Sequence, residues 1–190
     1  MRILLGVTGG IAAYKSCEFT SLAVKAGHDV RVIMTTNATR FVAPLTFEAL
    51  SGNAVLLDTF AGAPLPGSTS AIDHINWAKW AQAVLVAPLT ANTLAKLACG
   101  LADDALTTVL LAVPASTPVV LAPAMNTGMW DHPVVRRNLE WLRALDRYVL
   151  VDPVSKRLAC GDVGAGGLPD PSDLLGLVTT TTSPSSPIAG

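Results

Sequence analysis

Residues 2–13 read RILLGVTGGIAA, an apolar run followed by a glycine turn and the start of a helical pattern. The run is typical of a strand buried on both faces of a parallel sheet. Because helical patterns alternate with further runs of this kind, the sequence predicts an α/β fold, a doubly wound, Rossmann-like parallel sheet of about six strands in a three-layer α/β/α arrangement. The expected strands are Ile3–Val7, Val30–Met34, Ala54–Leu57, Ala83–Ala87, Val119–Ala122 and Tyr148–Val151, and the expected helices lie near 11–26, 90–99, 103–112 and 133–145.

Length and composition indicate one globular domain. The chain has 190 residues, of which 51% are hydrophobic and 14% are charged. This is too apolar for a disordered chain and more apolar than a monomer usually needs, so we expect some apolar surface to be buried between subunits. We expect a domain over residues 1–178 with a Gly/Pro/Ser-rich loop at 60–71 and a flexible flap at 153–171, followed by a tail of disordered composition at 179–190.

Charge, hydropathy and cysteine usage disfavour several partners and locations. The formal net charge of −1 gives no sign of a nucleic-acid or anionic-membrane partner. No stretch of about 18 apolar residues predicts a membrane span, and the first apolar run is too short for a secretion signal. The cysteines are odd in number, three, which argues against a disulfide framework and favours a cytoplasmic location.

Small and polar residues follow three of the expected strands, where ligands bind in sheets of this type. Glycines let backbone approach an anion, and hydroxyls and helix N–H groups can bind phosphate. Each corner alone fits a tight turn or a helix N-cap equally well or better, but together they favour a phosphate-bearing ligand. The corner residues are Thr8, Gly9 and Gly10, then Thr35, Thr36 and Asn37, then Thr90, Ala91, Asn92 and Thr93.

Two further stretches and one histidine could carry chemistry. Residues 123–130, PAMNTGMW, suit either an apolar pocket with Asn126 as polar anchor or a packed loop. His74 lies between apolar residues that would hold it against a core face, although a lone histidine is more often structural. Residues 157–167 place Cys160 among glycines near Arg157, which fits a reactive thiol on a mobile flap or an incidental cysteine. The histidines and cysteines never show metal-ligand spacing, so no metal site is expected.

Five stretches, in this order and spacing, resemble the homo-oligomeric flavin-containing cysteine decarboxylases. The similarity runs from about residue 2 to residue 175. The stretches are GVTGGIAAYK (6–15), the His74–Ile75 pair followed by KWA, APLTANTLAKLACGLADDALT (87–107), APAMNTGMW (122–130) and KRLACGDVGAGG (156–167). One departure is Gly167–Leu168, where many bacterial fused members have Arg-Met.

The resemblance implies a cofactor and roles for particular residues. FMN would contact the three corners and Ala124. His74 would be the catalytic base, and Cys160 would donate a proton from the flap. Asn126, Met129 and Arg157 would contact the substrate, with Asn126 holding its carboxylate. The resemblance also implies a trimer or a dodecamer with FMN at the subunit interface.

The implied activity is FMN-dependent oxidative decarboxylation of a terminal cysteine carboxylate. The expected substrate is phosphopantothenoylcysteine, a precursor in coenzyme A biosynthesis. One alternative is a peptidyl-cysteine decarboxylase that releases an enethiol for aminovinyl-cysteine formation. An alternative of another class is a non-catalytic flavin-binding regulatory subunit, which would not need both His74 and Cys160.

Overall fold

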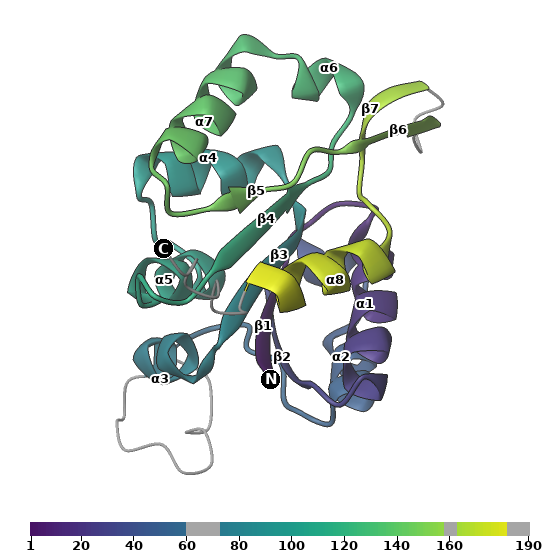
Figure 1. Ribbon diagram of the computed structural model, residues 1–190, viewed down its shortest axis with the longest axis vertical. Coiled ribbons are helices and arrows are strands. Elements are labelled where there is room, and N and C mark those ends of the chain that lie inside the picture. The colour runs from purple at the N-terminus through teal and green to yellow at the C-terminus, as the bar shows by residue number, and fades with distance from the viewer. Residues whose placement is uncertain (60–72, 158–162, 182–190) are drawn as a thin grey trace, which may run out of the picture.

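The computed structural model describes residues 1–59, 73–157 and 163–181 (Figure 1). Within these ranges, strands and helices alternate along most of the chain. The elements are β1 (Arg2–Val7), α1 (Ala13–Lys25), β2 (Asp29–Met34), the 3-10 helix η1 (Ala38–Arg40), α2 (Pro44–Ser51), α3 (Asp73–Trp80), β3 (Ala83–Leu89), α4 (Ala91–Cys99), α5 (Ala105–Ala112), β4 (Val119–Pro123), α6 (Thr127–Trp130), α7 (Pro133–Ala144), β5 (Val149–Leu150), β6 (Val154–Arg157), β7 (Val163–Gly167) and α8 (Pro171–Thr181).

The central sheet has five parallel strands in the order β2-β1-β3-β4-β5. The chain starts at β1, moves outward to β2, and then crosses to β3 on the other side of β1. The direction of winding therefore reverses between β1 and β3, where the loops that leave neighbouring strands diverge and leave room for a ligand. The doubly wound α/β fold predicted from the sequence is confirmed.

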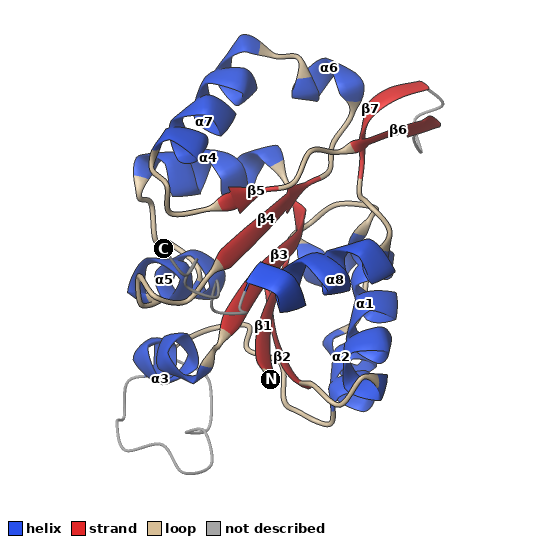
Figure 2. Ribbon diagram, in the orientation of Figure 1, coloured by secondary structure: helices blue, strands red, loops and turns tan. Residues whose placement is uncertain are grey.

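Helices cover both faces of this sheet (Figure 2). One face packs against α3, α4, α5 and α7 through a core that includes Trp77, Leu94, Leu106 and Leu139. The other face packs against α1, α2 and α8, with Phe19 among the fully buried side chains. The strands β3 and β4 are buried along their whole length, as their uninterrupted apolar sequence predicts. None of the helices in the described ranges is long and apolar enough to cross a membrane.

The strand expected at Ala54–Leu57 is wrong, because only Leu56 pairs with the sheet. Leu56 donates its N–H to the carbonyl of Val32 and accepts from the N–H of Met34, both at 3.0 Å. Three residues before Leu56, the side-chain amide of Asn53 donates to the carbonyl of Val30 at 2.9 Å. A side chain thus satisfies the acceptor that a continuing strand would have used, and the main sheet has five strands rather than about six.

The segment 153–171, expected to be a loop, contains strands β6 and β7, which pair antiparallel. Its glycines hid this pattern because a hairpin is held by backbone hydrogen bonds, which need no particular side chains. The helices α2, α3, α6 and α8 were also not predicted, and α8 extends to Thr181, into the expected tail. The expected loop at 60–71 lies outside the described residues.

Candidate functional site

A cavity of about 480 Å³ opens at the carboxyl ends of the parallel strands. Its size is typical of a small-molecule site. Its wall combines the three predicted corners with residues from α4, the start of α5 and the segment around α6. The lining residues are Gly9, Gly10, Thr35, Thr36, Asn37, Thr90, Ala91, Asn92, Thr93, Lys96, Asp103, Asp104, Met125 and Met129.

The structure brings most of the predicted cofactor residues to this wall, but not Thr8 or Ala124. Thr8 is fully buried, and its hydroxyl donates to the carbonyl of Pro88 at 2.6 Å while accepting the N–H of Thr90 at 3.0 Å. Thr8 therefore joins the end of β1 to the end of β3. Ala124 is half-buried, and its N–H donates to the carbonyl of Leu89 at 3.1 Å. Both residues connect the ends of neighbouring strands and do not line the cavity.

Gly9 lies where two corners approach most closely. A Cβ atom at this position would be 2.4 Å from the Cβ of Asn37 and 2.8 Å from its carbonyl carbon. These distances are far below van der Waals contact, and one of them is to backbone. Only glycine therefore allows the turn after β1 to pack against the turn after β2, whereas a Cβ at Gly10 would meet Thr90 at an ordinary 3.5 Å.

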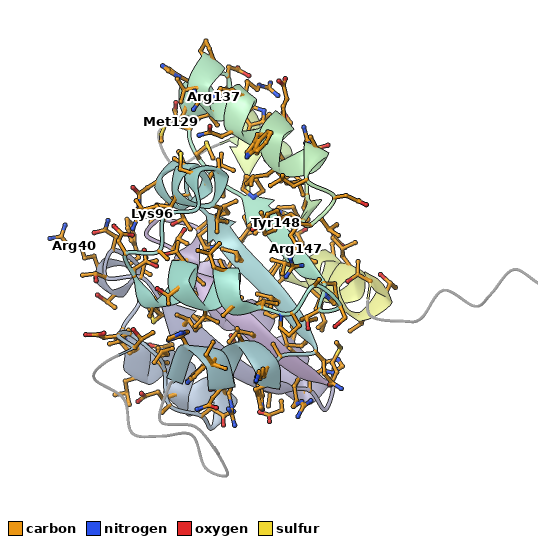
Figure 3. The ribbon with its side chains drawn as sticks, turned by 90° about the vertical axis from the view of Figure 1, so that its left-hand side faces the viewer. Arg40, Lys96, Met129, Arg137, Arg147 and Tyr148 are labelled. Atoms are coloured by element: carbon orange, nitrogen blue, oxygen red, sulfur yellow. The ribbon has the colours of Figure 1, made fainter. Side chains whose placement is uncertain are left out.

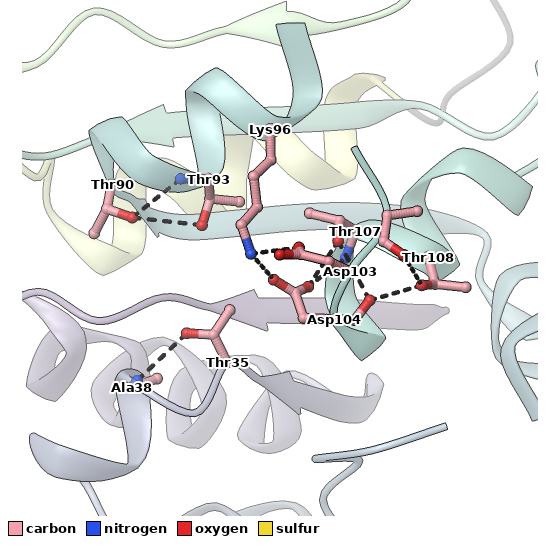
Figure 4. A network of polar contacts seen from close by, with 10 residues as sticks. Thr35, Ala38, Thr90, Thr93, Lys96, Asp103, Asp104, Thr107 and Thr108 are labelled. Atoms are coloured by element: carbon pink, nitrogen blue, oxygen red, sulfur yellow. Dashed lines mark hydrogen bonds and ion pairs between the residues drawn. The ribbon is translucent and has the colours of Figure 1, made fainter. Parts of the chain in front are cut away.

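A charged network that the sequence did not predict forms the side of the cavity next to α4 (Figure 4). Lys96 contacts Asp103 at 2.5 Å and Asp104 at 2.7 Å. Asp104 also caps α5, since its carboxylate accepts the N–H and the hydroxyl of Thr107, each at 2.8 Å. The lysine charge is thus matched by two carboxylates, and the anion-binding capacity of the cavity rests on neutral donors.

Burial alone would raise the pKa of Asp104, but the hydrogen bonds from Lys96 and Thr107 outweigh it. The pKa of this carboxyl therefore lies below its ordinary value of 3.8. For Lys96, burial would lower the pKa, and the bonds to Asp103 and Asp104 raise it overall. Both groups are held in their charged forms at neutral pH.

Asn126 and Met129 come from the segment that follows β4. The side-chain Oδ1 of Asn126 accepts the N–H of Gly128 at 2.8 Å and caps α6. Met125 and Met129, on either side of it in the sequence, line the cavity. In Figure 3, Met129 and Lys96 lie toward the same side of the molecule. Asn126 is not part of the cavity wall itself, but it belongs to a segment that is.

His74 lies apart from this cavity, in the first turn of α3. The guanidinium of Arg31 on β2 stacks on Trp80 of this helix at 4.2 Å and on Trp77 at 5.8 Å. Trp77 is buried against the face of the sheet that α5 also covers. His74 is half-buried and is not among the residues lining the cavity of its own chain.

Two other predicted residues cannot be placed against the cavity. Cys160 lies outside the described residues, and Arg157 ends β6 with its side chain outside the described part of the structure. Among the described residues, no three histidine, cysteine or acidic side chains gather as a metal site.

The arrangement suits a phosphate-bearing cofactor such as FMN. A glycine turn allows close approach, threonine hydroxyls and asparagine amides offer donors, and α4 begins at the wall with Thr90 as its N-cap. The methionines add an apolar side for a flat ring system. Lys96 was missed because its partners, Asp103 and Asp104, lie in the turn between α4 and α5, and only the path of that turn brings them to the lysine.

We predict that Gly9→Ala destabilises the protein and weakens FMN binding. The added Cβ would force the two corners apart, at a cost of about 1–3 kcal/mol. Thermal unfolding and flavin titration would measure both effects. Gly10→Ala is the matched control, with near-normal unfolding expected. If Gly9→Ala unfolds like Gly10→Ala, the close packing of the two corners is not as described.

We predict that Asp104→Asn lowers the free energy of unfolding at pH 7 by about 1–2 kcal/mol, the value of a charge-assisted hydrogen bond. Asparagine can still cap α5, so the change removes mainly the charge. Because the folded pKa of Asp104 is depressed, its contribution is complete above the unfolded pKa and disappears as pH falls through the folded pKa. The difference from wild type should therefore shrink below about pH 4 in denaturant titrations.

The matched control for this change is Asp103→Asn, because Asp103 contacts the same lysine but its side chain is 53% exposed. A smaller loss is expected there. Equal losses for the two variants at every pH would contradict the assignment.

Comparison with known proteins identifies the family to which this chain belongs. Residues 1–183 match the Flavoprotein family. The chain is 51% identical over 176 residues to the coenzyme A biosynthesis bifunctional protein CoaBC of Bacillus subtilis, covering 93% of this chain and 42% of that protein. It thus spans less than half the length of this relative. A Streptococcus mutans protein named as a probable phosphopantothenoylcysteine decarboxylase is 43% identical, with 89% of this chain and 92% of that protein covered.

Solved structures agree with the sequence relatives. A cysteine-to-serine mutant of PPC decarboxylase complexed with pantothenoylaminoethenethiol is 34% identical, with a TM-score of 0.81 and coverage of 95% of this chain and 97% of that one. The FMN-dependent cysteine decarboxylase SpaF is 32% identical, with a TM-score of 0.79 and coverage of 96% and 97%. Since the family match and these relatives extend over nearly the whole sequence, the chain belongs to the Flavoprotein family.

Proposed function

We propose that this chain is an FMN-dependent cysteine decarboxylase that acts on phosphopantothenoylcysteine in coenzyme A biosynthesis. The observation that carries the proposal is the cavity, which joins three small polar corners to the methionines around Asn126. The Streptococcus mutans relative supports the substrate, because 92% of its length aligns with this chain. A cytoplasmic location is part of the proposal.

The corner residues would hold FMN. Gly9 and Gly10 let the backbone approach a phosphate, and the threonines of the other corners add hydroxyl donors. When bound, FMN would supply a two-electron acceptor for oxidation of the thiol-bearing carbon, and the oxidised carbon can accept the electron pair left behind when CO₂ departs from the neighbouring carboxylate.

Three residues of the chain would handle the substrate. Asn126 accepts the N–H of Gly128 through Oδ1. Its amide nitrogen would donate to the substrate carboxylate. His74 takes a proton from the substrate during oxidation. Cys160, with Arg157 nearby in sequence, would supply the proton when the enethiolate left after CO₂ departs is reduced to a saturated thiol with the two electrons held on the cofactor.

The site would be completed by a second copy of the chain. His74 does not line the cavity of its own subunit, so α3 of a neighbouring subunit is the natural source of the base. Large apolar side chains lie exposed just before α1, on α1, just after η1 and on α2, next to the glycine turn and the second corner, and would be buried by such assembly. They are Ile11, Tyr14, Phe41 and Leu45, which are 48–71% exposed. A trimer, or a dodecamer built from trimers, is proposed.

The first test is turnover of defined substrates by protein loaded with FMN. We predict release of CO₂ from phosphopantothenoylcysteine, read by mass spectrometry. His74→Asn should abolish this release while FMN stays bound. Asn126→Asp should also be inactive, because a second carboxylate repels that of the substrate. His132→Asn is the matched control, since His132 caps α7 and asparagine is a good N-cap.

The same assay separates the alternatives. Sustained anaerobic turnover to a saturated thiol supports the coenzyme A precursor as substrate. A single turnover of a peptide ending in cysteine, followed by bleached flavin, supports the peptidyl-cysteine alternative instead. Failure to release CO₂ from either compound by yellow, FMN-loaded protein would leave the non-catalytic flavin-binding role.

The second test is complementation between inactive subunits. Each of His74→Asn and Asn126→Asp should be inactive alone. Mixed oligomers should recover about a quarter of the wild-type rate, the share of sites that random equal mixing supplies with both intact residues. Copurification through an affinity tag carried by one variant only would confirm that mixed oligomers form. A fully active monomer, or mixed oligomers without activity, would refute a site shared between subunits.

A further inference from the structure

The residues on either side of Asn126 are both hydrogen-bonded to strand β7. The N–H of Met125 donates to the carbonyl of Gly166 at 3.0 Å. The hydroxyl of Thr127 donates to the carbonyl of Ala165 at 3.1 Å. Two successive carbonyls of one strand therefore bracket Asn126, and α6 and β7 lie side by side at one end of the molecule (Figure 1).

Gly164 allows β7 to come this close. A Cβ on Gly164 would be 2.9 Å from the hydroxyl oxygen of Thr127 and 3.1 Å from its methyl carbon. Thr127 lies in the first turn of a short helix whose carbonyls already bond to Trp130 and Asp131, so its backbone has little room to retreat. Thr127 therefore packs closely against Gly164 of β7, and its hydroxyl points at the strand.

Gly166 is fixed by conformation as well as by contact. Its φ of 144° lies in a region that side-chain-bearing residues rarely adopt. This conformation belongs to the residue whose carbonyl accepts from Met125. The bracket around Asn126 therefore depends on Gly166, on Gly164 and on the Thr127 hydroxyl.

We propose that Thr127 is a positioning residue for recognition of the substrate carboxylate. It acts through Asn126: the bond from its hydroxyl to β7 sets the orientation of the segment 125–128, and thereby the direction of the Asn126 amide. This inference rests on the proposed function, in which Asn126 holds the carboxylate. Thr127 is not among the residues that line the cavity.

The first arm of the test compares Thr127→Val, which keeps the shape and loses the hydroxyl, with Thr127→Ser, which keeps the hydroxyl. In FMN-loaded protein, Thr127→Val should raise KM for phosphopantothenoylcysteine roughly fivefold, the effect of one net hydrogen bond. Inhibition by phosphopantetheine, which has the same arm without the carboxylate, should be unchanged. Thr127→Ser should restore the wild-type KM, and Gly164→Ala should reproduce the selective loss.

Thr117→Val is the matched control, since Thr117 also donates a hydroxyl to a carbonyl, that of Ala81, at the opposite end of the sheet. It should leave KM and inhibition as in wild type. Equal weakening of substrate and phosphopantetheine by Thr127→Val would mean a general structural role and would overturn the proposal. An unchanged KM would overturn it as well.

The second arm does not depend on turnover. Amide hydrogen exchange of Met125 reports its bond to Gly166 directly. Exchange should be faster in Thr127→Val than in wild type and normal in Thr127→Ser. If the wild-type protein decarboxylates nothing, the proposed function fails while this arm still decides whether Thr127 holds the segment. Identical exchange in all three proteins would overturn the positioning role.

Discussion

The site depends on the two hydrogen bonds made by the hydroxyl of Thr8. This hydroxyl bridges the carbonyl of Pro88 in β3 and the N–H of Thr90, just after β3, from a fully buried position at the end of β1. The hydroxyl of Ser16, on α1, adds a bond to the carbonyl of Ala87. The Thr8 contacts join β1 to β3, the two strands between which the sheet reverses its winding, and the Ser16 contact joins α1 to β3. With that junction set, Gly9 meets Asn37 on one side and Thr90 begins α4 on the other, so the corners face one cavity.

Charged side chains and neutral polar groups have different roles around the cavity. Charged side chains hold the scaffold, with Lys96 tying α4 to the start of α5 through two carboxylates. In the proposed site, ligand binding would be left to hydroxyls, amides and backbone N–H groups. Neutral donors bind a phosphate through directed hydrogen bonds, and such bonds require the accurate placement that the buried junction provides.

The fold and most of the cavity wall could be predicted from the sequence because both follow from local patterns. Apolar runs mark parallel strands, and the carboxyl ends of such strands meet at one edge, so Thr35–Asn37 and Thr90–Thr93 could be assigned to one site. Thr8 was assigned to the ligand because the sequence does not show which way a hydroxyl points. Lys96 was missed because its partners lie in the turn that follows its helix, and the sequence does not show the path of that turn. The bracket formed by β7 was missed because backbone carbonyls and a glycine contact leave no signal in composition.

The contact between Leu56 and β2 also determines how this protein can meet other chains. An edge strand whose backbone N–H and C=O groups are unpaired can pair with a strand of another molecule, which leads to aggregation. Here the Asn53 amide and the Leu56 backbone occupy acceptors and donors of β2 that would otherwise remain open, and β5, at the opposite margin, contributes only Val149 and Leu150. A five-stranded sheet with such short or occupied margins offers little for backbone pairing. Association at the margins of this sheet would therefore be made by side chains on the helices and turns, a type of contact that can be selective for one partner.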